Sequence, residues 1–501
     1  MEWDQLARFV SNSASGSGPA NDGRLALVYG RRRQGKSLIL ASLCTETGGF
    51  YWEALDGEER QNLASISQAW TVWSRSTTPV RFANWEEALD AVLGASDLAG
   101  KNVPVVIDEI PRVITRLAEF PSLLQRSLGP GRSTQHVLGT PLILCGSAFG
   151  EMRKLIDGTA PLRGRAILEL VVQPFDFRSA AEFWGLTGNQ QVAFAHNAFV
   201  GGTPAYRTLA DRDAPTDGDL DGWVIRRLLE PSSSLFRDGR IVVAEDQQLG
   251  DQQRYWGLLA AIVDGNRRWG ELELALGQQR GSLGHALDVV IDAGWVTKLD
   301  DPLKSNRSIY SLSEPMIRFY RLITEPNMQR LSVGGASAVW RDVRPIVASQ
   351  ILGAHMEQLA IDWVLRFASP QTLGGALARV GPTQLGLRRA PSAKPRPNIT
   401  SDTGDAGFQI GGDNTQIDLA GVEAGPRGDK HPIFVAEVKA TDARVGNDQL
   451  TRLDQAVHRL RAPNCHRLLF SRSGFTTDLE RVAASRPEVQ LIDLHRLYHG
   501  T

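Results

Sequence analysis

The segment Gly30-Arg-Arg-Arg-Gln-Gly-Lys-Ser37 constrains the fold more than any other part of the chain. It matches the pattern GxxxxGK[ST], follows an apolar run at 25–29 and precedes a helical pattern at 38–43. Glycines let successive backbone amides turn inward around a phosphate, and the start of the next helix adds positive potential. We therefore expect a phosphate-binding loop between a strand and a helix; the alternative is a chance glycine-rich turn.

The loop residues have defined roles if the phosphates belong to ATP. Lys36 is expected to reach the β- and γ-phosphates and to act in catalysis, and Ser37 is expected to ligate Mg²⁺. The expected nucleotide-binding set within and just after the loop is Gly30, Arg31, Arg32, Arg33, Gln34, Gly35, Lys36, Ser37 and Leu38.

A second part of the expected ATP site is an apolar strand that ends in two carboxylates, Val105-Val-Ile-Asp108-Glu109. Asp108 is expected to hold Mg²⁺ and its water shell, and Glu109 to act as general base on the attacking water. Taken alone, the same residues also fit a strand-end carboxylate that caps the next turn.

Two further candidates follow the apolar strand Leu142-Ile-Leu-Cys-Gly146. Ser147 lies where the carboxyl ends of parallel strands face a ligand, so it is a candidate sensor of the γ-phosphate; the alternative is a helix cap. Arg165 is a candidate arginine finger with a catalytic role, and the alternative is a solvated or salt-bridged surface arginine.

The alternation of strand and helix patterns indicates an α/β fold with a parallel sheet covered on both faces. Strands are expected at 25–29, 50–52, 103–107 and 141–145. Residues from about 175 to 229 are read as polar helices that form a small lid.

Residues 252–312 have the pattern of a winged helix, with three helices followed by a hairpin. The third helix carries His285 and few basic groups, opposed by Asp288 and Asp292, so it is a weak DNA reader. DNA contact and packing against the ATPase core therefore stay open as alternatives.

A second α/β domain is expected after a segment at 380–416 that we read as a loop or insertion. Its strands are expected at 416–422, 433–439 and 467–471. Glu437 and Lys439 lie two apart in a strand and project to one face, and Asp418 joins them if the two strands pair. Asp418 and Glu437 are expected to bind Mg²⁺, with Glu357 as a further ligand, and Lys439 to orient or activate water for phosphodiester cleavage. The alternative is a strand with exposed charges.

The composition and the start of the chain argue against a strongly basic protein, a disulfide-rich protein and a membrane protein. The 501 residues carry a formal net charge of −1, so any nucleic-acid surface must be a local patch. The three cysteines are far apart and give no disulfide framework. Because the chain start lacks signal-peptide features and no apolar run could span a bilayer, we expect a cytoplasmic protein with no membrane partner.

Five motifs in register resemble the archaeal-type P-loop ATPases, a branch of the STAND and AAA+-related NTPases. They are Gly30–Ser37, Val106-Ile-Asp-Glu-Ile-Pro111, Leu144-Cys-Gly-Ser147, Leu162-Arg-Gly-Arg165 and Gly201-Gly-Thr-Pro-Ala-Tyr206. The resemblance covers most of 20–330 and implies a RecA/AAA+-like parallel-sheet ATPase core, a helical lid and a winged helix. Many members also carry a restriction-endonuclease-like domain of the PD-(D/E)xK type, which Asp418 and Glu437-x-Lys439 match, with Glu357 in the place of the family's helical glutamate.

The expected domains are an ATPase core at 1–175, a helical lid at 176–250, a winged helix at 251–330 and a nuclease-like domain at 331–501. We expect an ATPase that acts on DNA, in which ATP gates a Mg²⁺-dependent nuclease domain. The alternative is a nucleotide switch or scaffold in which ATP controls homo-oligomerisation or partner binding and the C-terminal domain binds nucleic acid without cutting it.

Overall fold

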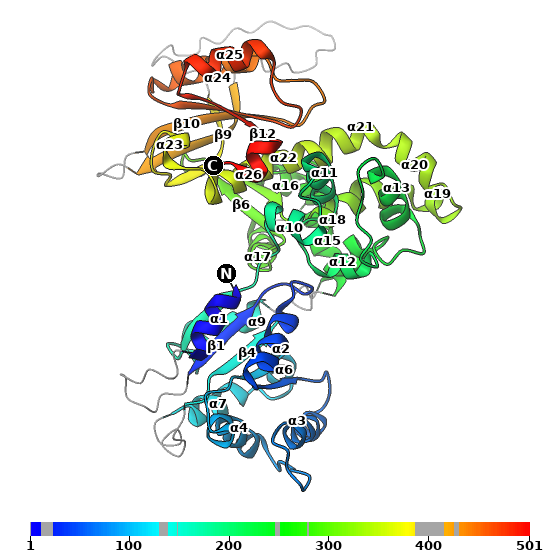
Figure 1. Cartoon of the computed structure of the whole chain (residues 1–501), viewed down its shortest axis with the longest axis vertical. Coiled ribbons are helices and arrows are strands. Elements are labelled where there is room, and N and C mark those ends of the chain that lie inside the picture. The colour runs from blue at the N-terminus through cyan, green and yellow to red at the C-terminus, as the bar shows by residue number, and fades with distance from the viewer. Residues whose placement is uncertain are drawn as a thin grey trace, which may run out of the picture.

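The computed structural model describes residues 2–11, 24–129, 139–147, 149–245, 251–277, 280–385, 415–424 and 430–501. In Figure 1 an N-terminal unit, blue to cyan, lies at one end of the molecule and an α/β unit, yellow to red, at the other. Helices and a small hairpin lie between the two units.

The N-terminal sheet has five strands in the order β2-β3-β4-β1-β5, and all four neighbouring pairs are parallel. The strands are β1 Leu25–Tyr29, β2 Phe50–Glu53, β3 Val105–Asp108, β4 Leu142–Gly146 and β5 Ala166–Val171. The predicted parallel α/β sheet is thus confirmed, and each of its four predicted strands overlaps an observed one. The phosphate-loop motif lies directly after the buried strand β1.

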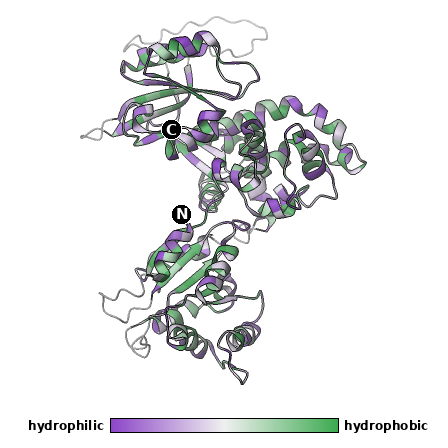
Figure 2. Ribbon diagram, viewed as in Figure 1, coloured by the Kyte–Doolittle hydropathy of each residue, from purple (hydrophilic) through white to green (hydrophobic). Residues whose placement is uncertain are grey.

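Alternation along these strands produces two buried faces. Leu25, Leu27 and Tyr29 face one way and pack with α3 Glu59–Trp73, α4 Trp85–Leu93 and α7 Phe120–Ser127. Ala26 and Val28 face the other way and pack with α1 Glu2–Ser11 and α2 Lys36–Thr47. Shorter helices complete the unit: α5 Ala95–Ala99, α6 Pro111–Arg116 and α9 Phe149–Lys154. Figure 2 shows the apolar strands between more polar helices.

The helices after the sheet differ from the polar lid expected from sequence. They are α10 Phe177–Trp184, α11 Gln190–Val200, α12 Ala205–Leu209, α13 Leu220–Val224, a π-helical turn Ile225–Leu229 and α14 Asp238–Ala244. Residues 192–200 of α11 are all buried, so this helix lies inside a core rather than over a site.

A second set of helices continues the same core. It includes α18 Pro315–Phe319, α19 Met328–Ser332, α20 Ala336–Asp342, α21 Arg344–Ile346 and α22 Gly353–Arg366, with π-helical turns at Tyr320–Thr324 and Val347–Leu352 and a 3-10 turn at Glu325–Asn327. One hydrophobic cluster joins these helices to α10, α11 and one face of the C-terminal sheet. We call helices α10 to α14 and α18 to α22 the helical body. The helical body and the C-terminal unit therefore share a core.

The predicted winged-helix elements are present. Helices α15 Gln252–Val263, α16 Trp269–Leu276 and α17 Arg280–Asp292 precede the antiparallel strands β6 Val296–Asp300 and β7 Ser308–Leu312. Their hydrophobic cluster also includes Val242 and Val243 of α14 and Ile317 of α18, and Trp295 is fully buried in it.

The C-terminal sheet has the order β12-β11-β10-β9-β8. Its strands are β8 Arg379–Leu385, β9 Thr415–Ala424, β10 Lys430–Lys439, β11 His466–Ser471 and β12 Val489–Asp493, with helices α23 Pro370–Leu373, α24 Asn447–Leu460, α25 Thr477–Ser485 and α26 Leu494–His499. Residues 379–385 form a strand where a loop was expected, because they pair with β9; 386–414 lie outside the described residues. Among the described helices, none is long and apolar enough to cross a membrane.

Candidate functional site

The loop at 30–37 turns back on itself between β1 and α2. Gly35 has φ 85°, Arg33 has φ 71° and Gly30 has φ 151°, conformations that glycine adopts most readily. Lys36 is 5% exposed, and its ammonium donates to the carbonyl oxygens of Gly30 and Arg31, each at 2.8 Å. Burial lowers the pKa of Lys36, and the carboxylates of Glu109 and Asp108 oppose that shift. The loop is therefore a tight nest with one buried cation at its centre.

Asp108 is fully buried beside this loop, at the end of β3. Its carboxylate accepts hydrogen bonds from the Tyr51 hydroxyl at 2.7 Å and from the Glu109 amide at 2.8 Å. Burial alone would raise the pKa of Asp108, but hydrogen bonds from the Cys145 thiol and from the Tyr51 and Ser37 hydroxyls hold it below its usual value. Ser37 and Asp108 therefore lie side by side, in the arrangement that a shared Mg²⁺ requires.

Glu109 follows Asp108 with φ 49°. This left-handed conformation is uncommon outside glycine, so the surrounding structure holds the residue there. The Ser147 hydroxyl donates to Glu109 Oε2 at 3.0 Å. The structure thus brings together the candidate base and the candidate sensor, one from each of the neighbouring strands β3 and β4.

The loop arginines point elsewhere than sequence reasoning expected. Arg31 forms an ion pair with Glu314 at 3.0 Å and lies over the Trp295 ring at 4.5 Å. Arg33 pairs with Asp238 and, at 3.0 Å, with Glu245. These two side chains connect the loop to the helical body, so only the backbone amides of Arg31 and Arg33 remain available to phosphates.

The turn at 201–206 lies directly against the phosphate loop. Gln34 donates to the Thr203 hydroxyl at 3.3 Å, and the Ala205 amide donates to the Arg33 carbonyl at 3.4 Å. A Cβ on Gly202 would lie 1.9 Å from the Phe175 carbonyl oxygen, which explains the second glycine of the motif. Sequence reasoning noted this motif but missed its role.

Four other residues near the loop were not predicted. They are Tyr51, Asp238, Trp295 and Glu314. Burial raises the pKa of Glu314, and the charge of Arg31 opposes this. None of the four belongs to a local pattern, because each reaches the loop from a different element.

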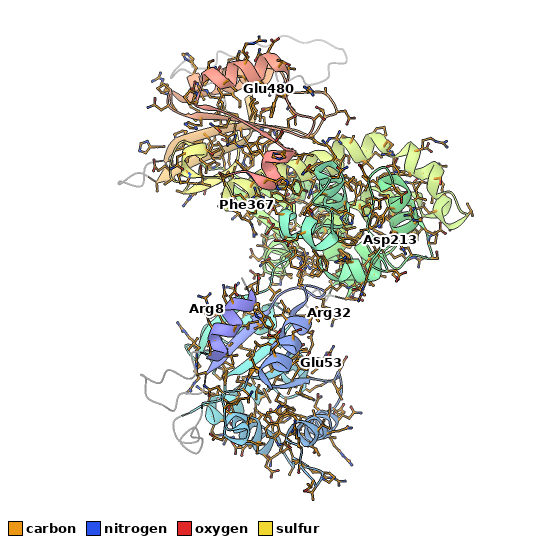
Figure 3. All side chains as sticks on the ribbon, in the orientation of Figure 1. Arg8, Arg32, Glu53, Asp213, Phe367 and Glu480 are labelled. Atoms are coloured by element: carbon orange, nitrogen blue, oxygen red, sulfur yellow. The ribbon has the colours of Figure 1, made fainter. Side chains whose placement is uncertain are left out.

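The remaining predicted residues of this site have different positions. Figure 3 places Arg32 at the end of the N-terminal unit that faces the helical body. Leu38 lies on the first turn of α2 and is 73% exposed. Arg165 donates to the Leu128 carbonyl and immediately precedes β5, whose first residue pairs with Leu25 at the start of β1. Because the loop follows the other end of β1, about 13 Å along the strand, Arg165 does not reach the phosphate site of its own chain.

The second candidate site lies where β9 and β10 separate. Asp418 Oδ2 accepts from the Val438 amide at 2.8 Å, in place of a continued strand ladder. The β8–β9 register shifts between Gly381 and Thr383, and such an irregularity re-aims nearby side chains. Burial, and next the charge of Glu437, raise the pKa of Asp418 to about 6, while Lys439 opposes the shift. Asp418, Glu437 and Lys439 are therefore within electrostatic reach of one another.

Two cations hold Glu437, whose side chain is 4% exposed. Lys439 and Arg452 both donate to Glu437 Oε1, at 2.5 Å and 2.8 Å. The expected projection of Glu437 and Lys439 to one face is confirmed. Arg452 of α24 was not predicted; it lies one helical turn after Gln449 and also donates to that side chain.

Glu357 is paired differently from the expectation. Its carboxylate accepts from Arg267 of the winged helix at 3.0 Å. Within the described ranges, no three His, Cys, Asp or Glu side chains gather closely enough to hold a metal ion. Glu357 nevertheless lies close enough to Asp418 for its charge to add to the raised pKa of that carboxyl, so the ligand set Asp418, Glu437 and Glu357 stays a prediction.

Comparisons with known proteins give distant similarities. No family model matches the chain. An uncharacterized protein of Methanocaldococcus jannaschii is 23% identical over 370 residues, which cover 72% of this chain and 77% of that protein. Among solved structures, the Walker-type ATPase of Pyrococcus abyssi has a TM-score of 0.46 and 19% identity over 64% of this chain and 94% of its own.

The ORC2 protein of Aeropyrum pernix, solved in ADPNP–ADP complexes, has a TM-score of 0.41 and 14% identity over 68% of this chain and 93% of its own. Both TM-scores lie below 0.5. The assignment as an α/β P-loop fold therefore rests on the parallel sheet and the loop geometry described above.

Proposed function

We propose that this chain binds ATP with Mg²⁺ at the loop 30–37 and hydrolyses it. The observation that carries the proposal is the Lys36 ammonium buried within this loop, next to strand β3 that ends in the buried Asp108. Lys36 would turn from the Gly30 and Arg31 carbonyls to the phosphates, and Glu109 would accept a proton from the attacking water. Bound Mg²⁺ would neutralise phosphate charge between Ser37 and Asp108.

ATP hydrolysis by purified full-length variants tests this proposal. Lys36→Ala should lower the rate by roughly 10²-fold or more, and Glu109→Gln should lower kcat while ATP binding persists. Lys154→Ala is the matched control, because this lysine is 73% exposed and pairs with the neighbouring Glu151. A Lys36→Ala protein that hydrolyses ATP like the wild type would show that the site is assigned wrongly.

We further propose that the C-terminal unit cleaves DNA phosphodiesters with Mg²⁺ at Asp418 and Glu437. The support is the juxtaposition of two carboxylates with Lys439 at the open end of the β9–β10 pair. In the reaction one water attacks phosphorus, the P–O bond breaks, and the released alcohol takes the proton. Lys439 would orient the water, and Arg452 would release Glu437 when a metal ion replaces it.

Cleavage of DNA with Mg²⁺ or Mn²⁺, with and without ATP, tests this second activity. Asp418→Asn and Lys439→Ala should each abolish cleavage, while Lys430→Ala, at the other end of β10, should leave it unchanged. Dependence of the rate on ATP would support gating of the nuclease by the nucleotide. If wild type, Asp418→Asn and Lys439→Ala all fail to cut, the C-terminal unit is not a nuclease.

A nucleotide switch without cleavage is the second candidate, and one observation favours it. Arg31 and Arg33 tie the phosphate loop to Glu314 and Asp238 of the helical body. A ligand that moves the loop would change these buried pairs and so bias the body between arrangements. ATP-dependent changes in assembly or partner binding, with no DNA cleavage, would favour this function over the first.

A further inference from the structure

A cavity of about 910 Å³ lies between the winged helix and the C-terminal sheet. Its winged-helix wall carries Arg267, Arg268, Trp269 and Arg307. Its opposite wall carries Glu357, Gln384, Gln416 and Asp418. Of the three proposed nuclease residues, Asp418 lines this cavity, which is open to solvent on one side and bordered by the winged helix on another.

The two walls form a single packed body. The Thr383 hydroxyl donates to Asp301 at 2.9 Å, and Lys304 donates to the Gln384 carbonyl. A Cβ on Gly381 would lie 2.4 Å from the Asp300 carbonyl oxygen, so β6 and β8 approach as closely as backbones allow. The wing is thus bound to the edge of the C-terminal sheet, which gives the cavity a defined shape.

The lining combines three arginines with four carboxylates, Glu271, Asp301, Glu357 and Asp418, so a nucleotide strand would place its phosphates on the arginine side. The guanidinium groups of Arg267, Arg268 and Arg307 suit phosphate oxygens. Trp269 packs partly against the winged-helix core and also lines the cavity, where its ring offers a stacking surface. Arg267 and Arg268 are 35% and 51% exposed and pair with exposed carboxylates, so these ion pairs are weak and open to exchange with phosphates. Gln384 and Gln416 supply amide donors and acceptors for base edges.

The size of the cavity selects the form of the strand. Volumes of about 300–1,000 Å³ enclose ligands of drug size, which corresponds to about one to three nucleotides. A duplex is far wider, since its major groove alone admits a whole α-helix. A single strand or an unpaired end fits inside this volume, whereas an intact duplex could only lie across its open side.

We infer that this cavity binds a single-stranded nucleic-acid segment and leads it to Asp418, an assignment that rests on the proposed nuclease function for its catalytic meaning. Arg268 and Arg307 hold phosphates, and Trp269 stacks on a base. The winged helix thus acts as the substrate clamp of the C-terminal site, and it does so with its α16 and wing residues rather than with α17.

Binding of a fluorescein-labelled single-stranded dT12 to the full-length protein, followed by anisotropy in EDTA, tests the inference without cleavage. Arg268→Glu combined with Arg307→Glu should weaken binding at least 10-fold and reduce the slope of log K against log salt by about 0.7 for each lost phosphate contact. Trp269→Ala should weaken binding about 5-fold or more. Arg341→Glu, 79% exposed on α20, is the matched control and should stay within about 2-fold of wild type.

The outcomes separate this inference from the proposed nuclease. Wild-type binding that prefers the single strand over the same sequence in a duplex, and that is lost in the double arginine variant, supports the cavity even if no DNA is cut. Equal binding by wild type and the double variant, or absence of binding to dT12, overturns it even if cleavage occurs. Because Arg268 and Arg307 are both exposed, the double variant should fold; circular dichroism of each protein would check this.

Discussion

At the scale of single residues, the buried pair Arg31–Glu314 joins the phosphate loop to the rest of the molecule. Arg31 is 8% exposed and Glu314 is 2% exposed. Thr203 and Tyr206 also donate to the Glu314 carboxylate, at 3.4 and 3.5 Å. Charges this deeply buried are tolerated only because each satisfies the other.

Removal of one partner should therefore cost more than removal of both. Glu314→Gln should destabilise the folded chain by about 3 kcal/mol, because Arg31 loses its counter-charge, and Arg31→Met with Glu314→Leu should recover much of that loss. Thermal unfolding of the full-length variants measures both effects.

The exposed pair Arg330–Asp342 provides the control for this experiment. Its side chains are 49% and 51% exposed, so Asp342→Asn should change stability by less than about 0.5 kcal/mol. A Glu314→Gln protein as stable as this control would mean that the buried pair does not stabilise the fold.

At the scale of elements, the strand–loop–helix unit at the nucleotide site depends on close backbone approach. A Cβ on Gly30 would lie 2.4 Å from the Val172 carbonyl oxygen, and the Val172 amide itself donates to the Tyr29 carbonyl at 2.8 Å. The segment after β5 thus fixes how the chain leaves β1. A side chain at Gly30 would push the loop away from this position.

Gly30→Ala should accordingly weaken ATP binding at least 10-fold without unfolding the sheet. Titration with a fluorescent ATP analogue measures the affinity, and circular dichroism reports the fold. Gly188→Ala is the matched control, since nothing lies within 4 Å of its added Cβ. Unchanged affinity in Gly30→Ala would contradict the close packing of the loop.

At the scale of the whole molecule, the winged helix contacts both candidate sites. Trp295 lies under Arg31 of the phosphate loop, and Arg153 of α9 pairs with Asp292 of α17 at 3.4 Å. On its other side, Arg267 pairs with Glu357 and the wing binds β8. Of the two roles left open by the sequence, packing against the N-terminal unit is observed, and the same module also packs against the C-terminal sheet.

Two buried histidines should give the helical body a marked pH dependence. Burial lowers the pKa of His196 and of His355 to about 3, with the charge of Arg318 adding to the shift at His355. Both are neutral in the folded chain but gain protons below about pH 6.5 when unfolded. The contribution of these two histidines to the free energy of unfolding is therefore fully present above that pH and is lost as pH falls from about 6.5 towards 3.

Comparison of unfolding at pH 7.5 and 5.5 measures this loss. Each histidine should contribute about 1.4 kcal/mol to the difference, and His196→Phe with His355→Phe should remove most of it. His458→Phe, at an exposed position of α24, should leave the pH dependence as in wild type. An equal pH dependence in the double variant would show that other groups are responsible.

The sequence by itself determined the local units of this protein. Four such units could be predicted, because each depends on the spacing of residues within one short segment. They are the phosphate loop, the strand that ends in Asp108 and Glu109, the winged-helix elements and the Glu437–Lys439 face. The period of strands and helices and the needs of a tight turn act over a few residues, so they leave a local signature.

Only the tertiary structure decided what these units touch. The pairing of Arg31 with Glu314, of Glu357 with Arg267 and of Glu437 with Arg452 joins distant segments. The fold also keeps Arg165 and the phosphate loop apart by the length of a strand. A charged side chain has no spacing rule for a partner on another element; its partner depends on which elements share a core and at which edge they meet.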